Sequence, residues 1–278
     1  MNTKPATATA LAHPNIAFIK YWGDKDSSLH IPENGSLSMN LDCLYSQTTV
    51  EFDSSLEKDL LTIDGQVPDK TSVHRVHEFL NLVRSLAGIS TFANVTSENN
   101  FPTGSGIASS ASGFAALCMA ASTAAGLELD RRELSRLARR GSGSACRSIP
   151  GGFVEWLRGE DDRSSYAVSI APHNYWDLRD CIAVTSRKHK ETGSTAGHSL
   201  ARSSPLQAVR VRDAESRLDL CRDAILKRDF DELADIVEQD SNQMLAVMMT
   251  SQPRIYYWQP ATQDLMQSVV SWRSSGIP

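Results

Sequence analysis

The stretch that decides the fold spans residues 102–112 and reads Pro-Thr-Gly-Ser-Gly-Ile-Ala-Ser-Ser-Ala-Ser. Its glycines let the backbone approach a bulky anion and adopt positive φ angles. The turn opens a long helix of small residues that runs to about Ala125, and the start of a helix attracts anions. No lysine follows, so the loop differs from the P-loop pattern. A tight turn before an alanine-rich core helix is the alternative interpretation.

Hydrophobic periodicity and turn residues predict further elements on both sides of this stretch. Upstream, we expect strands at 40–52 and 91–96, a hairpin at 60–67 with Asp64-Gly65 at its turn, and a helix at 71–86 that Gly88 stops. Downstream, we expect a short basic helix at 130–140 with Asp130 as N-cap, and an extended segment at 148–157. A charged turn or boundary at 159–163 and a buried strand around 181–184 follow. Three further helices are expected at 205–226, 229–249 and 260–273.

The bulk composition is that of an ordinary soluble globular protein. The 278 residues suggest about two domains, and 41% are apolar. A formal net charge of −5 provides no global basic field for nucleic acid or an anionic membrane. Five widely spaced cysteines show no zinc or redox spacing, which is typical of reduced thiols in a cytoplasmic protein. His74 and His77 share a predicted helix face, where exposure is favoured over metal binding.

Two more segments favour anion binding. Residues 139–148 read Arg-Arg-Gly-Ser-Gly-Ser-Ala-Cys-Arg-Ser, in which glycines, serines and three arginines form a compact cradle for a phosphate. A solvated basic turn is the alternative. Residues 188–195, Lys-His-Lys-Glu-Thr-Gly-Ser-Thr, offer the same donors. Three such loops in an acidic protein indicate several phosphates that converge on one cleft.

An apolar segment near the N-terminus carries embedded polar residues. Residues 14–23 read Pro-Asn-Ile-Ala-Phe-Ile-Lys-Tyr-Trp-Gly. Lys20 must find a partner within this run, because burial of an unpaired ammonium is costly. A structural ion pair or a snorkelling side chain is the alternative to a functional role.

Taken together, these segments resemble the mevalonate diphosphate decarboxylases of the GHMP kinase superfamily. The combination of Arg-Gly-Ser-Gly-Ser-Ala-Cys-Arg-Ser at 140–148 with Gly-Gly-Phe-Val-Glu-Trp at 151–156 is very specific, whereas the loop at 102–112 alone indicates only the superfamily. The other matching pieces are residues 15–23, 35–38, 192–197 and 240–243, in the order of the family.

The resemblance implies an α+β fold of two packed domains with the active site between them. The N-terminal, ribosomal-protein-like nucleotide-binding domain would cover residues 1–175, and a ferredoxin-like domain would cover 176–278. The family uses ATP to phosphorylate the 3-hydroxyl of a phosphorylated mevalonate, and loss of that phosphate with CO₂ leaves an isopentenyl product. Phosphate leaves carbon far more easily than hydroxide, so the protein supplies positioning and charge stabilisation. Members are often homodimers.

The resemblance also assigns site residues. The ATP phosphates would contact Pro102, Thr103, Gly104, Ser105, Gly106, Ala108, Ser109 and Ser110, and Ser110 is the candidate Mg²⁺ ligand. The phosphorylated tail of the substrate would contact Tyr21, Asp24, Ser142, Gly143, Ser144, Arg147 and Ser194.

Asp24 departs from the family pattern, in which lysine follows Tyr-Trp-Gly. A carboxylate beside a diphosphate repels it by about 1–4 kcal/mol at ~4 Å. The sequence therefore predicts a substrate with one phosphate, as in the mevalonate 5-phosphate decarboxylases of this family. Lys25 compensates instead if the loop shifts by one place.

A second departure concerns the catalytic residue. The family's Asp-Ala-Gly-Pro-Asn segment would follow Pro278, so no aspartate of this sequence is assigned the catalytic role and a missing C-terminal segment is expected. Two alternatives stay open: a mevalonate-type kinase without decarboxylation, and a non-catalytic nucleotide-binding paralogue. Release of CO₂ with ATP turnover separates the first alternative from a decarboxylase.

Overall fold

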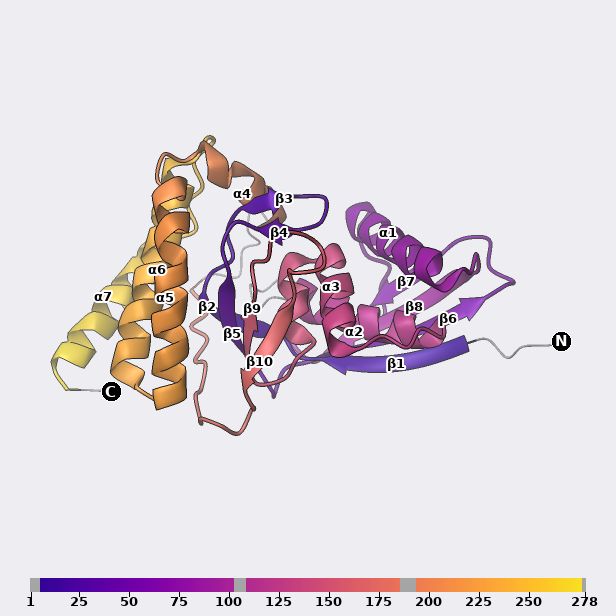
Figure 1. Ribbon diagram of the computed structural model, residues 1–278, viewed down its shortest axis with the longest axis horizontal. Coiled ribbons are helices and arrows are strands. Elements are labelled where there is room, and N and C mark those ends of the chain that lie inside the picture. Colours follow the sequence, from indigo (N-terminus) through magenta and orange to yellow (C-terminus); the bar gives the residue numbers. More distant parts are fainter. Residues whose placement is uncertain (1–5, 103–108, 186–193, 277–278) are drawn as a thin grey trace.

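The computed structural model describes residues 6–102, 109–185 and 194–276 (Figure 1). Within these ranges the strands form two four-stranded sheets and one small two-stranded sheet. The first sheet has the order β1-β6-β8-β7, and only the β7–β8 pair within it is parallel. Its strands are β1 (Ala6–Ala12), β6 (Ser46–Asp53), β8 (Phe92–Asn99) and β7 (Leu60–Ile63).

Two helices cover the first sheet. They are α1 (Lys70–Ala87), capped by Asp69 and by Gly88 at φ 66°, and α2 (Ser109–Ala124). Most of α2 is alanine and serine, so its backbone lies close to β1 and β6. Together with Val50, Val95 and the α1 residues Phe79 and Leu80, this face forms the largest buried cluster. The sheet thereby fixes where the N-terminal end of α2 lies.

The second sheet has the order β10-β9-β5-β2 and lies between two layers. Its strands are β2 (Asn15–Ile19), β5 (Ser36–Asn40), β9 (Phe153–Trp156) and β10 (Ala167–Ala171). On one side α5 (Gln207–Lys227) and α6 (Phe230–Thr250) bury Leu218, Ile225 and Leu233 against Phe18 and Leu37 (Figure 1). On the other side lie α3 (Arg131–Gly141) and the short 3-10 helix η1 (Gly143–Ser148).

The remaining elements surround this second sheet. The hairpin of β3 (Asp24–Asp26) and β4 (Ile31–Pro32) follows β2. Next to it lie α4 (Ser194–Leu200) and η2 (Ala201–Ser203), which lead into α5 (Figure 1). The outer helix α7 (Pro260–Ser274) is tied to α6 by an ion pair from Arg273 to Glu238 at 2.5 Å.

The helix predictions are confirmed to within about two residues by α1, α3, α5, α6 and α7. Their caps explain this accuracy. Asp130 and Glu133 form a capping box at the start of α3, and Asp229 accepts the Glu232 N–H at the start of α6. The charged turn at 159–163 lies in the loop that joins β9 to β10, which pair as a hairpin.

Two strand predictions are only partly right. The segment 40–52 divides into β5, which ends at Asn40, and β6, which begins at Ser46, because the chain turns between them with a Leu44 N–H bond to Leu41. The turn at Asp64-Gly65 is present, with positive φ at both residues. However, the chain leaves the sheet after a single bridge at Gln66, and β7 pairs in parallel with β8 instead.

The prediction of a buried strand around 181–184 is wrong. These residues form no strand, and Ile182 and Val184 are 45% and 74% exposed. An apolar run becomes a strand only where a neighbour satisfies its backbone groups. Within the described part of the chain, residues 181–184 pair with none of the strands of the three sheets. Across the described residues, no helix combines the length and apolar character needed to span a bilayer.

Candidate active site

Arg147 is a buried cation at the end of η1. Only 3% of its surface is exposed, and burial lowers the pKa of its guanidinium. Its Nε donates to Asn15 Oδ1 at 3.1 Å and its Nη1 donates to Ser36 Oγ at 2.6 Å. Among the described residues, no carboxylate oxygen lies within 4.0 Å of its nitrogens. Because a buried charge without a counter-ion is costly, this position is suited to an incoming anion.

The turn that carries Arg147 is fixed by two neighbouring strands. Asn15 on β2 donates from Nδ2 to the Ser144 carbonyl at 3.2 Å and to Ser148 Oγ at 2.8 Å. Asn40 on β5 donates to the Arg147 carbonyl at 3.2 Å. Sequence reasoning gave Asn15 no role, although an asparagine inside an apolar strand is a signal that a buried partner exists.

Tyr21 lies between Gly143 and His198. A Cβ at Gly143 would lie 2.7 Å from Tyr21 Cε1, so only glycine allows this approach. The Tyr21 ring stacks on His198 at 4.0 Å between centroids and contacts the edge of Trp156 at 4.7 Å. The Arg147 guanidinium lies 5.7 Å from the centroid of the same Trp156 ring. The structure thus brings together Tyr21, Gly143 and Arg147, which are far apart in the sequence.

Ser142 and Ser144 lie in the same turn and are half-buried. Ser142 ends α3, where its N–H donates to the Ala138 carbonyl at 3.2 Å, and its carbonyl accepts the Ala145 N–H at 2.8 Å. At the start of η1 the Ser142 hydroxyl makes no capping hydrogen bond within the described part of the chain. Both serines therefore flank Gly143 in the phosphate cradle that the sequence predicts.

Asp24 lies beside the Tyr21 hydroxyl and is negatively charged. It accepts a short hydrogen bond from the Tyr21 hydroxyl, and its carboxylate lies 3.9 Å from His30 Nδ1. Burial alone would raise the pKa of Asp24, but His30 and Tyr21 outweigh it and hold the pKa below its usual value. Lys25, by contrast, is ion-paired with Glu160 and 45% exposed. The residue bonded to the Tyr21 hydroxyl is therefore the acid Asp24, and not Lys25.

His198 was missed by sequence reasoning. It lies on α4, and its Nδ1 accepts the Gly23 N–H at 3.1 Å. Burial lowers its pKa to about 4, so the imidazole is neutral at pH 7 with its proton on Nε2. A Cβ at Gly197 would lie 2.3 Å from the Trp22 ring, so α4 is packed tightly on this loop. Ser194 is the first residue of α4, and its side chain lies outside the described part.

The predicted nucleotide loop is described only at its two ends. Thr103, Gly104, Ser105, Gly106 and Ala108 lie outside the described residues, as does most of the anion-binding segment 188–195. Pro102 and Ser110 are exposed, and Ser109 and Ser110 are the first residues of α2. The first turn of α2 carries no acidic side chain to neutralise the helix dipole. Ser112 Oγ lies 2.7 Å from Ser46 Oγ, which anchors this end of α2 to β6.

Lys20, in the apolar segment, is half-buried and makes hydrogen bonds with both its side chain and its backbone. Lys20 Nζ donates to the Ala17 carbonyl at 2.7 Å, and burial lowers its pKa to about 8. Its backbone N–H donates to Asp240 Oδ2 at 2.8 Å. Asp240 is fully buried and also accepts bonds from Arg210 at 3.4 Å and Arg217 at 3.2 Å. Asp240 therefore has a structural role, because its charge is shared by two arginines.

Comparisons with known proteins identify the family. The model of the diphosphomevalonate decarboxylase-like N-terminal domain matches residues 12–167, and that of the mevalonate 5-diphosphate decarboxylase C-terminal domain matches residues 181–275. The chain belongs to the diphosphomevalonate decarboxylase family. The α+β fold of the GHMP kinase superfamily and the family resemblance are thereby confirmed, whereas a domain boundary at residue 175 stays a prediction.

Three relatives of the family show how closely this chain follows them. Diphosphomevalonate decarboxylase of Ganoderma lucidum is 41% identical over 97% of this chain and 72% of its own length. Phosphomevalonate decarboxylase of Haloferax volcanii is 35% identical over 96% of this chain and 82% of its own length. The solved structure of MDDEF in complex with MVAPP, AMPPCP and magnesium is 38% identical, with a TM-score of 0.92 over 99% of this chain and 85% of that chain.

His198 makes the stability of this family member depend on pH. The pKa of His198 is 6.5 when unperturbed and about 4 in the fold, so the unfolded chain binds more protons between these values. Stability is therefore lost as pH falls from about 6.5, by about 2–3 kcal/mol at pH ~4.5. Asp24 opposes this pKa shift, whereas His30, Arg147 and Arg210 reinforce it.

Urea unfolding at pH 7 and pH 4.5 checks this dependence. We expect His198→Gln to remove the part of the stability loss between pH 7 and pH 4.5 that His198 causes. His74→Gln, at an exposed position on α1, should leave the stability loss unchanged. An equal loss of stability in wild type and His198→Gln would contradict the assignment.

Proposed function

We propose that the protein catalyses the ATP-dependent decarboxylation of mevalonate 5-phosphate to isopentenyl phosphate, through phosphorylation of the 3-hydroxyl. The observation that carries the proposal is the buried Arg147 guanidinium, which has no carboxylate partner among the described residues and lies beside Tyr21 and Gly143. The relatives named as decarboxylases of phosphorylated mevalonates support the same chemistry.

The tail of the substrate binds in the pocket formed by the turn 142–147 and the loop after β2. Arg147 supplies a charge that forms strong hydrogen bonds to a phosphate group, and Gly143 keeps the backbone close to it. Ser142 and Ser144 add donors on either side, and we assign Ser194 to the same group of tail-binding residues. The turn, held by the hydrogen bonds of Asn15, orients the substrate so that its 3-hydroxyl meets the nucleotide.

ATP and Mg²⁺ fit the described end of α2. MDDEF, whose solved structure contains AMPPCP and magnesium, supports their use. We assign the ATP phosphates to Pro102, Thr103, Gly104, Ser105, Gly106, Ala108, Ser109 and Ser110, with Ser110 as Mg²⁺ ligand. When bound, ATP with Mg²⁺ supplies the phosphoryl group that turns the 3-hydroxyl into a leaving group. The start of α2 contributes its positive dipole end at that place.

Asp24 makes the pocket suited to one phosphate instead of two. Its carboxylate is 11% exposed, is held by the Tyr21 hydroxyl and carries a negative charge. A diphosphate tail carries more charge and reaches further than a monophosphate, so Asp24 repels it more strongly. The alternative cation, Lys25, is bound to Glu160. Both kinds of substrate occur in the names of the relatives, one of which is a phosphomevalonate decarboxylase.

Substitution of Asp24 tests this preference. We expect wild type to prefer mevalonate 5-phosphate, and Asp24→Lys to shift the ratio of the two kcat/KM values toward the diphosphate by about tenfold, equivalent to ~1.4 kcal/mol. Asp24→Asn keeps the shape and an acceptor for Tyr21 but removes the charge, so it should shift the ratio by less. The protein expressed from its complete gene is assayed for ADP and CO₂ with both substrates. A wild-type preference for mevalonate 5-diphosphate would contradict the proposed role of Asp24.

The expectations of a homodimer and of a cytoplasmic location stay predictions. Gel filtration with light scattering measures the first, and fractionation of the source cells measures the second.

A further inference from the structure

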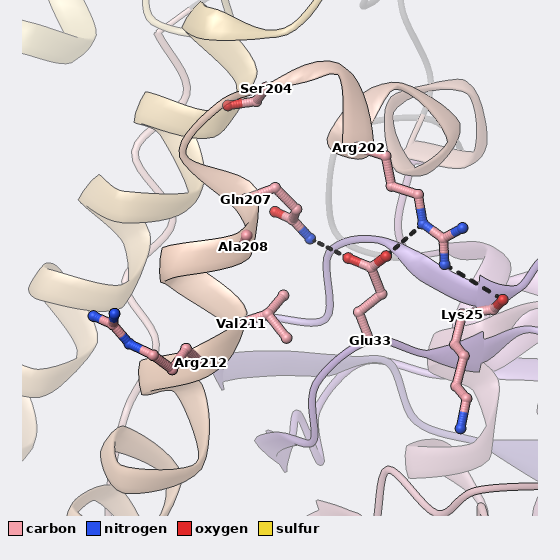
Figure 2. Close-up of a pocket in the computed structure, with 8 residues that line it drawn as sticks. All are labelled: Lys25, Glu33, Arg202, Ser204, Gln207, Ala208, Val211 and Arg212. Atoms are coloured by element: carbon pink, nitrogen blue, oxygen red, sulfur yellow. Dashed lines mark hydrogen bonds and ion pairs between the residues drawn. The ribbon is translucent and has the colours of Figure 1, made fainter.

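A polar network lies on the outer side of the loop that carries Tyr21 and Asp24. We propose that Glu33, Arg202 and Gln207, named here the outer clamp, are positioning residues that hold residues 22–25 in the place where Tyr21 and Asp24 form the tail pocket. This inference rests on the proposed function of that pocket. The clamp borders a surface cavity of about 590 Å³, which Figure 2 shows between the loop, η2 and α5.

Glu33 is the centre of the clamp. Its backbone N–H donates to the Gly23 carbonyl at 3.0 Å. Its Oε1 accepts from Arg202 Nε at 2.6 Å, and its Oε2 accepts from Gln207 Nε2 at 2.6 Å (Figure 2). The carboxylate thus accepts hydrogen bonds from two sides, and the Glu33 side chain is only 14% exposed. Two residues from the second half of the chain therefore reach the first half through one carboxylate.

The same donors also hold the backbone of the loop. Gln207 Nε2 donates to the Trp22 carbonyl at 2.9 Å, and Arg202 Nη2 donates to the Lys25 carbonyl at 3.4 Å. These bonds lie on either side of Gly23, which has φ 97°. A Cβ there would lie 2.6 Å from Gln207 Nε2 and 2.7 Å from the Glu33 carboxylate, so glycine is needed for the clamp to close.

The inner side of the loop is held by His198, which accepts the Gly23 N–H and stacks on Tyr21. The N–H of Gly23 therefore bonds inward, while its carbonyl bonds outward to Glu33. The two backbone groups of Gly23 are thus both hydrogen-bonded, one on each side of the loop. Tyr21 directly precedes the clamped residues and Asp24 lies among them, so a loosened clamp displaces both from the pocket while α2 and its nucleotide end stay in place.

The expected effect is on binding of the phosphorylated tail. Arg202 is 61% exposed, so its ion pair alone contributes little, but its two bonds join the Glu33 carboxylate to the main chain at Lys25. We expect Arg202→Gln and Glu33→Gln to weaken binding of mevalonate 5-phosphate about tenfold, since a displacement of ~1 Å in a site is costly. Affinity for an ATP analogue should stay within twofold.

Arg212 provides the matched control. It lines the same cavity, is 71% exposed and is paired with Asp213 instead of the loop. Arg212→Gln removes a charge of the same sign from another side of the same cavity and should change neither affinity (Figure 2). Arg202→Lys keeps a cation beside Glu33 and should recover affinity to within about threefold of wild type.

Two measurements on the complete protein test the clamp: calorimetric titration with mevalonate 5-phosphate and with the ATP analogue, and hydrogen exchange of a peptide spanning residues 20–34. In Arg202→Gln and Glu33→Gln, we expect weaker tail binding and faster exchange of this peptide, with melting temperatures near that of wild type. Wild-type exchange in both variants overturns the clamp, as does an equal loss of affinity in Arg212→Gln. If the two variants exchange faster than wild type but wild type itself does not bind mevalonate 5-phosphate, the result supports the clamp and contradicts the proposed function.

Discussion

Arg147→Ala should lower kcat/KM for the phosphorylated substrate by about 30- to 1,000-fold, equivalent to ~2–4 kcal/mol. The guanidinium is buried and has no carboxylate within 4.0 Å among the described residues, which supports the proposal that it binds the substrate phosphate. Loss of the arginine leaves that phosphate without its charged partner. Steady-state kinetics on the protein from the complete gene measures the effect.

Two further variants separate this role from a structural one. Arg147→Met removes the uncompensated buried cation and fills its space, so activity should collapse while the free energy of unfolding is kept or raised. Arg158→Ala is the matched control, because Arg158 is 42% exposed and paired with Glu160. It should retain activity within twofold. If Arg147→Ala also stays within twofold of wild type, Arg147 does not bind the substrate.

Asp240→Ala should lower the free energy of unfolding by about 3–5 kcal/mol, the largest stability effect that we expect. Asp240 is fully buried and holds Arg210, Arg217 and the Lys20 N–H. Its removal leaves two buried arginines without this shared anion, at the place where α5 and α6 meet β2. Urea unfolding followed by circular dichroism gives the change.

The control for Asp240 lies on the same helix. Asp235 is 85% exposed and only 3.8 Å from Arg273, so Asp235→Ala should change stability by less than about 0.5 kcal/mol. A loss below about 1 kcal/mol in Asp240→Ala would show that the two arginines find other partners or water, and would contradict the structural role of Asp240.

Local signals in the sequence predict the helices but not the pairing of strands. The caps Asp130 and Asp229 and the stop at Gly88 act within a few residues of the element that they bound, so they can be recognised without tertiary structure. The apolar run at 181–184 has strand composition, but composition does not say whether a neighbouring strand is present. β7 likewise pairs with β8 instead of the residues just after it.

The same limit applies to the site. The family motifs predict Tyr21, Gly143 and Arg147, and the structure brings them together. The residues that hold them were not predicted, because their partners are remote: 132 residues separate Asn15 from Arg147, and 175 separate Gly23 from His198. The Ser194 side chain and the centre of the nucleotide loop lie outside the described part of the protein, so the roles of these residues stay proposals.

The measurement that tests the central claim most directly is the stoichiometry of the reaction. The protein from the complete gene is incubated with ATP, Mg²⁺ and carboxyl-labelled mevalonate 5-phosphate, and ADP, labelled CO₂ and isopentenyl phosphate are quantified together. We expect one CO₂ and one isopentenyl phosphate for each ADP, with a higher kcat/KM than for mevalonate 5-diphosphate. ADP formation without release of CO₂ would contradict the account and identify a kinase instead.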